Sequence, residues 1–165
     1  ETDDPGIFSL GFGKKLDNDF RIEFNYSKST VSTDSFTVTS GGSGVTASIT
    51  PALEYDVATY MIYGLRDFSN DSKFTPYAGI GAGFANISAD DQIATIAGTA
   101  YSFTSAEESV FSYAIKGGIS YEVTDNASLI TELGYVHLNA YESEGNVNYD
   151  SNNLVGLTAG VRFSF

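Results

Sequence analysis

The sequence predicts an all-β fold: an antiparallel up-and-down transmembrane β-barrel of eight strands, seven of which lie in this chain. Three observations lead to this prediction. Apolar and polar residues alternate with a period of two in several segments, which gives a strand one apolar and one polar face. The connections between these segments alternate between short and long, and no run of 18 apolar residues that would form a transmembrane helix occurs.

The alternation is clearest at the end of the chain. One face there carries Leu157, Ala159, Val161, Phe163 and Phe165, and the other carries Thr158, Gly160, Arg162 and Ser164. Six more segments follow the same rule. In chain order, the predicted strands are Ile7–Leu16, Phe20–Val31 or longer, Leu53–Phe68, Phe74–Ile87, Val110–Val123, Ser128–Tyr141 and Asn153–Phe165.

Each segment has its own evidence. The first alternates Phe8, Leu10 and Phe12 with small residues, the second alternates Phe20, Ile22 and Phe24 with polar ones, and the fourth and fifth alternate in the same way. The third and sixth are less regular, because Leu129, Leu133 and Val136 also fit one face of a helix. Gly134 and the neighbouring strands favour the strand interpretation there.

The connections indicate how the strands are arranged. Short polar turns are expected at residues 17–19, 69–72 and 124–126, and long connections through residues 40–44, 90–109 and 142–152. Residues 32–48 are rich in Ser, Thr and Gly and are expected to be a mobile loop. Alternating short and long connections are typical of outer-membrane barrels, with tight periplasmic turns and long outer loops.

The number of strands carries a further expectation. Single-chain bacterial barrels have an even number of strands, and an open seven-stranded sheet leaves two unpaired edges that lipid does not tolerate. We therefore expect an eighth, N-terminal strand outside this sequence, with Glu1–Gly6 as the tail of its outer loop. The alternative is a strand hidden in a long connection, at Ser35–Thr39 or Gln92–Ile96.

The two faces of the strands suggest their surroundings. The polar face is also the small face, rich in Gly, Ser, Ala and Thr, whereas the other carries Phe, Tyr, Leu, Ile and Val. A narrow eight-stranded interior suits small residues, and an outer apolar band with aromatic girdles suits lipid. The alternative is a soluble lipocalin-like barrel with its large face inward.

Composition excludes several classes of protein. The net charge of −13 argues against nucleic-acid binding, which needs clustered Lys and Arg. The absence of Cys excludes disulfides and Cys-ligated zinc. We expect a single domain over residues 1–165, with no cofactor and no metal.

Four motifs spread over the chain resemble one family. Phe74-Thr75-Pro76-Tyr77-Ala78-Gly79-Ile80-Gly81-Ala82-Gly83, Leu16–Glu23, Thr131–Tyr135 and Gly160–Phe165 are similar to segments of the surface-antigen, opacity-like outer-membrane barrels, relatives of the OmpA transmembrane domain. Two departures stand out. The family's usual first strand is absent, and His137 and Leu138 replace a common Arg–aromatic pair, so no role is carried onto them.

The resemblance implies an integral protein of the outer membrane of a Gram-negative cell, with extracellular loops and a periplasmic C-terminus. Its expected partners are outer-membrane lipid, lipopolysaccharide, the barrel-assembly machinery and surface ligands of the loops, as in adhesion, immune exposure or phage attachment. The C-terminal residues Val161, Phe163 and Phe165 resemble the signal by which such barrels are recognised for insertion.

Charged residues on the small face are the candidate site. They are Arg21, Glu23, Lys116, Glu122, Glu132 and Arg162. Ionised groups in a narrow interior must be paired, and Glu132 and Arg162 lie on sequence-adjacent strands where they are candidates to pair. Similarity to OmpA-type domains implies a salt-bridged plug. The alternative is a small-solute or ion-conducting porin whose selectivity these charges set.

Enzymatic alternatives have less support. A lipid-modifying hydrolase needs Ser, His and a carboxylate in contact, but the one His, His137, has Tyr135 and Asn139 as its neighbours on the same face, and no Gly-x-Ser-x-Gly motif occurs. The acidic pairs Asp3-Asp4, Asp90-Asp91 and Glu107-Glu108 lack the spacing of a calcium loop. We expect no enzymatic activity.

Overall fold

The computed structural model describes residues 6–40, 43–143, 147–149 and 151–164, and these residues form strands and turns. No helix in this part of the chain is long and apolar enough to cross a membrane. The strands are β1 (Phe8–Lys15), β2 (Phe20–Ser40), β3 (Ser43–Asp67), β4 (Phe74–Ala89), β5 (Gln92–Ile96), β6 (Thr99–Phe103), β7 (Ala106–Thr124), β8 (Ala127–Leu138), β9 (Tyr141–Ser143), β10 (Val147–Tyr149) and β11 (Asn152–Phe163).

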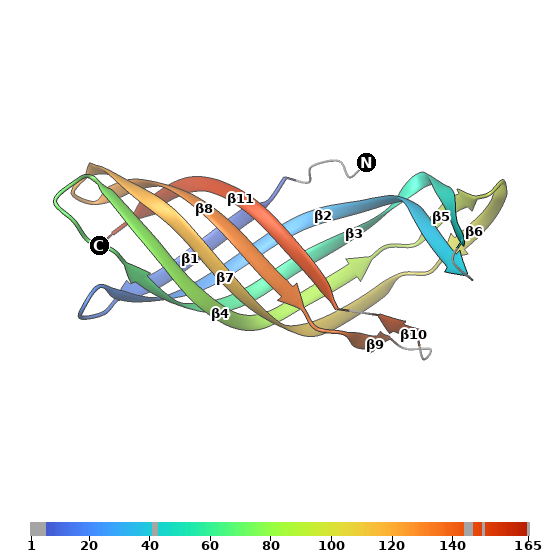
Figure 1. Cartoon of the computed structure of the whole chain (residues 1–165), viewed down its shortest axis with the longest axis horizontal. Coiled ribbons are helices and arrows are strands. Elements are labelled where there is room, and N and C mark those ends of the chain that lie inside the picture. Colours follow the sequence, from blue (N-terminus) through green and yellow to red (C-terminus); the bar gives the residue numbers. More distant parts are fainter. Residues whose placement is uncertain (1–5, 41–42, 144–146, 150, 165) are drawn as a thin grey trace. The chain divides into compact units, whose positions relative to one another are not determined.

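Seven of these strands lie side by side in chain order, β1-β2-β3-β4-β7-β8-β11 (Figure 1). The last three are antiparallel: β7 pairs with β8 with one register shift between Glu122 and Thr124, and β11 pairs with β8 without interruption from Asn152–Leu138 to Phe163–Ala127. The all-β, antiparallel up-and-down fold is therefore confirmed. The seven predicted strands correspond to these seven.

The long connections differ from the prediction. β2 continues to Ser40 and β3 already begins at Ser43, so the stretch expected to be a mobile loop is mostly strand. The Thr and Val residues of this stretch explain the difference, because β-branched side chains favour extended backbone. Gln92–Ile96 is also a strand, as the alternative reading allowed, but β5 pairs with β3 and β6 and does not join the row of seven.

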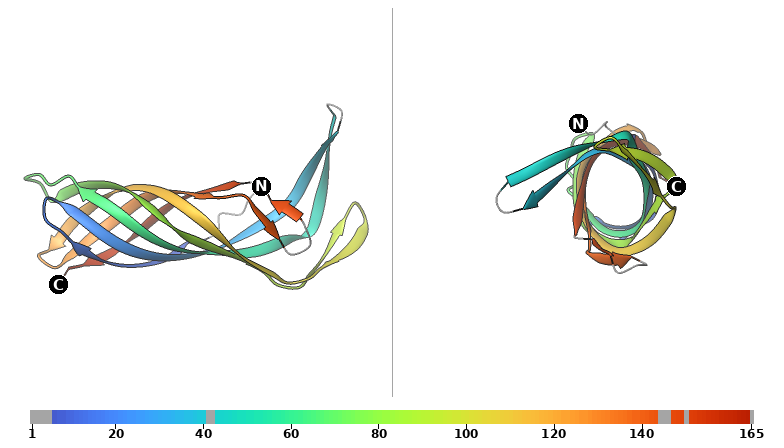
Figure 2. Two further views of the ribbon diagram at one scale, coloured as in Figure 1. Left: turned by 90° about the horizontal axis from the view of Figure 1, so that it is seen from below. Right: turned by 90° about the vertical axis from the view of Figure 1, so that its right-hand side faces the viewer.

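The chain divides into two compact units. Unit 1 comprises residues 1–8, 28–58 and 86–109. It holds the C-terminal part of β2 and the N-terminal part of β3 together with the β5–β6 hairpin. Unit 2 comprises residues 9–27, 59–85 and 110–165 and holds the wall of seven strands, whose curvature around a common interior is visible in Figure 2.

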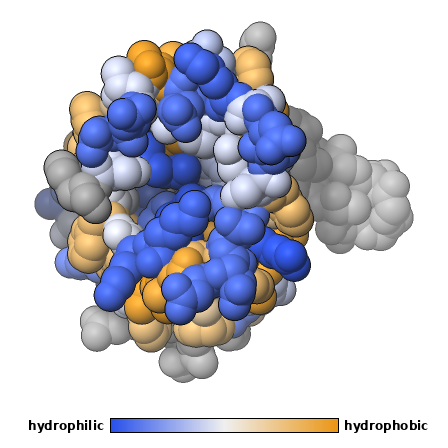
Figure 3. Space-filling model, turned by 90° about the vertical axis from the view of Figure 1, so that its left-hand side faces the viewer, coloured by the Kyte–Doolittle hydropathy of each residue, from blue (hydrophilic) through white to orange (hydrophobic). Residues whose placement is uncertain are grey.

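Unit 2 has its large apolar side chains on the outside. Along β7, Ser112, Ala114 and Lys116 are buried, whereas the alternating Phe111 and Tyr113 are exposed. The outer face of every wall strand continues this pattern with exposed Phe, Tyr, Ile, Leu or Val side chains. Seen from the end with the short turns, hydrophilic residues cover the end and apolar residues lie at the sides (Figure 3).

The interior of unit 2 is bulkier than the sequence pattern predicts. Its core cluster is made of Met61, Tyr63, Leu65, Tyr77 and Ala114. The bulky members fit because glycines face them: a Cβ on Gly81 would lie 2.6 Å from the Tyr63 ring, and one on Gly118 would lie 2.8 Å from the Tyr77 ring. The small residues on the inward faces of β4 and β7 thus leave the space that large side chains of neighbouring strands fill.

The two outermost wall strands, β1 and β11, do not pair with each other over the residues that the structure describes. Among the described residues β1 pairs with β2 and β11 pairs with β8, and neither has a second neighbour. All eight residues of β1 are exposed. The predicted absence of direct pairing between Phe8–Lys15 and the last strand is what the structure has.

Candidate functional site

The candidate site is a network of ion pairs inside unit 2. Arg21 on β2 donates from Nη1 to Asp67 Oδ1 of β3 at 2.6 Å, and its Nε lies 3.5 Å from Glu23 Oε2. Arg21, Glu23 and Asp67 are all buried. They meet because Arg21 and Glu23 are two residues apart on one strand and so share a face, and the adjacent strand brings Asp67 to the same face.

Lys116 on β7 is the second centre of the network. Its Nζ donates to Glu23 Oε1 at 2.5 Å and lies 3.1 Å from Glu132 Oε1 of β8. Lys116 is only 7% exposed. Glu23 therefore joins the two parts of the network, because its carboxylate forms ion pairs with both Arg21 and Lys116.

Aromatic rings contact the cations. Two guanidinium groups lie over the Tyr77 ring, with the Arg21 Cζ 5.0 Å and the Arg162 Cζ 4.8 Å from its centroid. Lys116 Nζ lies 4.3 Å from the Tyr63 ring centroid. Such contacts stabilise a desolvated cation by up to about 2 kcal/mol. Rings and carboxylates together hold Arg21 and Lys116, and the Tyr77 ring contacts Arg162.

The network balances its charges. Arg21, Lys116 and Arg162 face Glu23, Asp67 and Glu132, three cations against three anions. Burying an unpaired charge costs several kcal/mol, so a neutral set is the arrangement a narrow interior tolerates. Among the described residues, five buried atoms of these side chains and of Tyr77 make no hydrogen bond of normal geometry: Arg21 Nε and Nη2, Tyr77 Oη, Glu132 Oε1 and Arg162 Nη2.

The structure departs from the sequence-based site in three respects. Glu122 is exposed beside an irregularity of the β7–β8 register and is not part of the network. Glu132 pairs with Lys116 and not with Arg162, because the register places Thr158 opposite Glu132 and Ser128 opposite Arg162.

The third departure is a missed residue, Asp67. β3 has apolar residues on both faces, with Tyr60 and Ile62 outside and Met61 and Tyr63 inside. The alternation therefore does not reveal which face is inward. In the structure Asp67 shares the inward face of Met61 and Tyr63, whereas Phe68 lies on the exposed face with Ile62.

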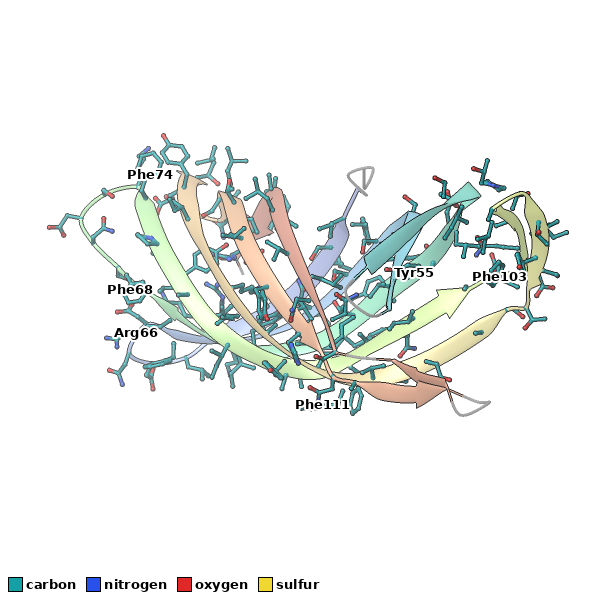
Figure 4. All side chains as sticks on the ribbon, turned by 45° about the vertical axis from the view of Figure 1, so that its right-hand side comes forward. Tyr55, Arg66, Phe68, Phe74, Phe103 and Phe111 are labelled. Atoms are coloured by element: carbon teal, nitrogen blue, oxygen red, sulfur yellow. The ribbon has the colours of Figure 1, made fainter. Side chains whose placement is uncertain are left out.

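The outer face of unit 2 has aromatic pairs at both ends. Phe74 packs on Tyr121 with ring centroids 4.7 Å apart, and Phe84 packs on Phe111 at 5.9 Å. Phe74 and Phe111 lie far apart along the wall in Figure 4. The two pairs are ten residues apart on both strands, which is about 33 Å along a strand and about 25 Å along the axis at a tilt of about 40°. This matches the apolar band of an outer-membrane barrel.

His137 and the last strand have structural contacts. His137 Nδ1 lies 2.7 Å from Asn153 Oδ1, and its ring stacks on Tyr113 at 4.6 Å. Neither partner is a Ser or a carboxylate. Val161 and Phe163 of the proposed assembly signal are exposed on the outer face, and Phe165 lies outside the described residues.

Comparisons with known proteins agree with this geometry. The family model described as outer membrane protein beta-barrel domain matches residues 1–163. Outer membrane protein PagN of Salmonella typhimurium is 30% identical over 100 residues. That match covers 61% of this chain but only 39% of PagN. The crystal structure of Neisserial surface protein A (NspA) has a TM-score of 0.66 and 19% identity, and the match covers 98% of this chain and 84% of that one.

Proposed function

We propose that this chain, which belongs to the outer membrane protein beta-barrel domain family, is a non-enzymatic surface protein of the bacterial outer membrane. In this proposal its long connections lie outside the cell and make contacts there, and its short turns and C-terminus lie in the periplasm. The barrel interior is closed by side chains and serves as a plug.

One observation carries the plug: the neutral interior network of Arg21, Lys116, Arg162 and three carboxylates, packed with Tyr63 and Tyr77. Eight strands leave an interior just wide enough for side chains. Ions would have to cross the buried ion pairs that Arg21 and Lys116 make with Glu23, Asp67 and Glu132. Planar-bilayer recordings of the purified protein are therefore expected to show no large, stable conductance.

The orientation has a direct test because the chain has no native Cys. Thr99→Cys in unit 1 should react with a membrane-impermeant maleimide on intact cells. Asp71→Cys, in the short turn between β3 and β4, is the matched control and should react only after the outer membrane is permeabilised. Equal labelling of both variants on intact cells, or labelling of Asp71→Cys alone, would overturn the proposed orientation.

Contacts with lipid and with the assembly machinery belong to the same proposal. Phe163 is 65% exposed on the outer face of β11, where an aromatic ring suits the membrane interface. Phe163→Ser is expected to lower the amount of inserted protein in cells more than it lowers folding into detergent. Unchanged membrane levels of this variant would contradict the assembly role.

A second candidate, a narrow pore, is favoured by the unpartnered atoms of Arg21, Tyr77, Glu132 and Arg162. Buried polar atoms without protein partners are places where water binds. The pore predicts small channels whose ion preference changes in Lys116→Gln. If neither the unmodified protein nor Lys116→Gln shows any conductance, the pore is excluded and the plug is supported.

A further inference from the structure

The β5–β6 hairpin in unit 1 is closed by a tight two-residue turn. Ile96 lies opposite Thr99, and the turn residues Ala97 and Gly98 have φ angles of 49° and 82°. Two successive positive φ values are the mark of a type I′ turn, which joins strands with a narrow hydrogen-bonded pair. Ile96 and Thr99 are therefore that pair.

This turn fixes the direction of the backbone groups along β6. Hydrogen-bonded and non-hydrogen-bonded pairs alternate along an antiparallel ladder. Thr99, Tyr101 and Phe103 therefore direct their N–H and C=O groups toward β5. Ala100 and Ser102, opposite Thr95 and Ile93, direct theirs to the opposite edge.

That opposite edge of β6 has no partner strand in the part of the chain that the structure describes. β5 has β3 on its far side, with Thr95 opposite Thr50, whereas β6 pairs with β5 alone among the described residues. The base of the hairpin is held by Asp91, whose Oδ1 accepts from Ser105 N at 2.6 Å. Gln92 holds it further with two hydrogen bonds to the backbone of Glu54. β6 is thus a fixed edge strand.

Side chains leave this edge accessible. Ala100 and Ser102 are small and exposed, and Ile93, directly opposite Ser102, is 69% exposed. A strand added beside β6 would place alternate side chains on the same face as Ile93. The edge therefore offers backbone hydrogen bonds and one apolar contact to an extended chain, the arrangement used in β-augmentation.

Charge selects the occupant. Residues 28–58 and 86–109 contain seven acidic residues and one lysine, a net charge of −6, and that lysine, Lys28, pairs with Asp56 at 2.7 Å. A second copy of this unit would be repelled by the like charge, whereas a basic segment would be attracted.

We infer that the free edge of β6 binds an extended, positively charged polypeptide segment of another protein as an added β-strand. The inference rests on the proposed function in that it gives the outer loops a class of ligand. It depends on unit 1 alone and not on which side of the membrane that unit lies.

The test measures binding of a fluorescein-labelled, N-acetylated Lys-Val-Lys-Val-Lys amide to the detergent-solubilised full chain by fluorescence polarisation. The decisive variant is Ser102→Pro. Proline removes the N–H that points to the free edge and leaves the β5–β6 hydrogen bonds intact, as prolines on edge strands do. Ser102→Ala is the matched control. We expect Ser102→Pro to weaken binding about tenfold and Ser102→Ala to change it less than about twofold.

Two further arms separate the causes. The Glu-Val-Glu-Val-Glu peptide should not bind, and raising NaCl from about 50 to about 300 mM should weaken the basic peptide. Amide exchange of Ala94 and Tyr101 reports whether the hairpin survives in Ser102→Pro. If it does not, a basic peptide N-methylated at alternate residues replaces the variant and should bind about tenfold more weakly.

Equal binding of both peptides, unchanged binding to Ser102→Pro with an intact hairpin, or undiminished binding of the N-methylated peptide would overturn the inference. Concentration-dependent dimerisation abolished by Ser102→Pro would assign the edge to a second copy instead. Failure of the proposed function looks different, because it appears in the cysteine labelling, which peptide binding does not affect.

Discussion

Lys116 is the residue whose removal tests the interior network most directly. Its Nζ has two anionic neighbours, Glu23 Oε1 at 2.5 Å and Glu132 Oε1 at 3.1 Å. At an effective dielectric constant of about 20, these attractions are worth about 7 and about 5 kcal/mol before desolvation is subtracted. Removal of one partner from a buried pair typically destabilises a protein by about 3–5 kcal/mol. We expect Lys116→Met to lower the free energy of unfolding by this amount.

The two carboxylates are not equally affected by this substitution. Glu23 keeps Arg21, whose Nε lies 3.5 Å from it, whereas Lys116 is the one ion-pair partner of Glu132 among the described contacts. Neutralising Glu132 should therefore rescue the variant better than neutralising Glu23. We expect Lys116→Met/Glu132→Gln to recover more than half of the loss, and Lys116→Met/Glu23→Gln to recover less, since it also leaves Arg21 with one fewer anion.

The assay is urea unfolding of the protein folded in detergent, followed by far-ultraviolet circular dichroism. Lys73→Met, at an exposed lysine in the turn before β4, is the matched control and should change stability by less than about 0.5 kcal/mol. A loss below about 1 kcal/mol for Lys116→Met, or better rescue by Glu23→Gln, would refute the network as described.

Three further predictions concern single positions. Gly81→Ala should lower the free energy of unfolding by about 1–3 kcal/mol, because its Cβ would lie 2.6 Å from the Tyr63 ring. Gly64→Ala is the control and should not lower it, because nothing lies within 4 Å of its Cβ position. Urea unfolding measures both variants. Ala97→Asn should stabilise the β5–β6 hairpin by about 1 kcal/mol, since Ala97 has a φ of 49°, seen as about fivefold slower amide exchange. Hydrogen bonds from Lys28 and Thr30 lower the pKa of Asp56. These hydrogen bonds therefore stabilise the folded state at pH values above the pKa that Asp56 has in the unfolded chain, and the stabilisation is lost as the pH falls through its pKa in the folded protein. In Lys28→Met the pKa of Asp56 should rise, which carboxyl NMR measures.

The faces of most strands were predictable from the sequence. On β4 and β7 one face is large and apolar and the other is small or polar, so residues such as Phe84 and Lys116 were assigned to the correct side. On β3 both faces are apolar, and the inward direction of Asp67 did not follow. Sequence patterning settles a face only where the two faces differ.

The pairing of charges was not predictable for a different reason. Alternation fixes the face of a residue, but a register shift of two residues leaves every face unchanged. Glu132 and Arg162 share the interior face in any such register, yet the actual register puts Arg162 opposite Ser128. Which charged residues pair depends on the register between the strands, and the hydrophobic pattern does not determine the register of β11 against β8.

The edges of the wall lead to a last prediction. In a row of seven alternating strands, β1 and β11 run in the same direction, and each has one neighbour among the described residues. Lipid leaves no backbone group unpaired, so we expect a further strand, antiparallel to both, to separate them. Leu10→Cys/Ala159→Cys should then stay reduced under mild oxidation in the membrane. The matched control, Thr131→Cys/Ala159→Cys, joins directly opposite residues of β8 and β11 and should crosslink. Efficient crosslinking of Leu10→Cys/Ala159→Cys would show that the two edges meet directly, and the eight-strand expectation would fail.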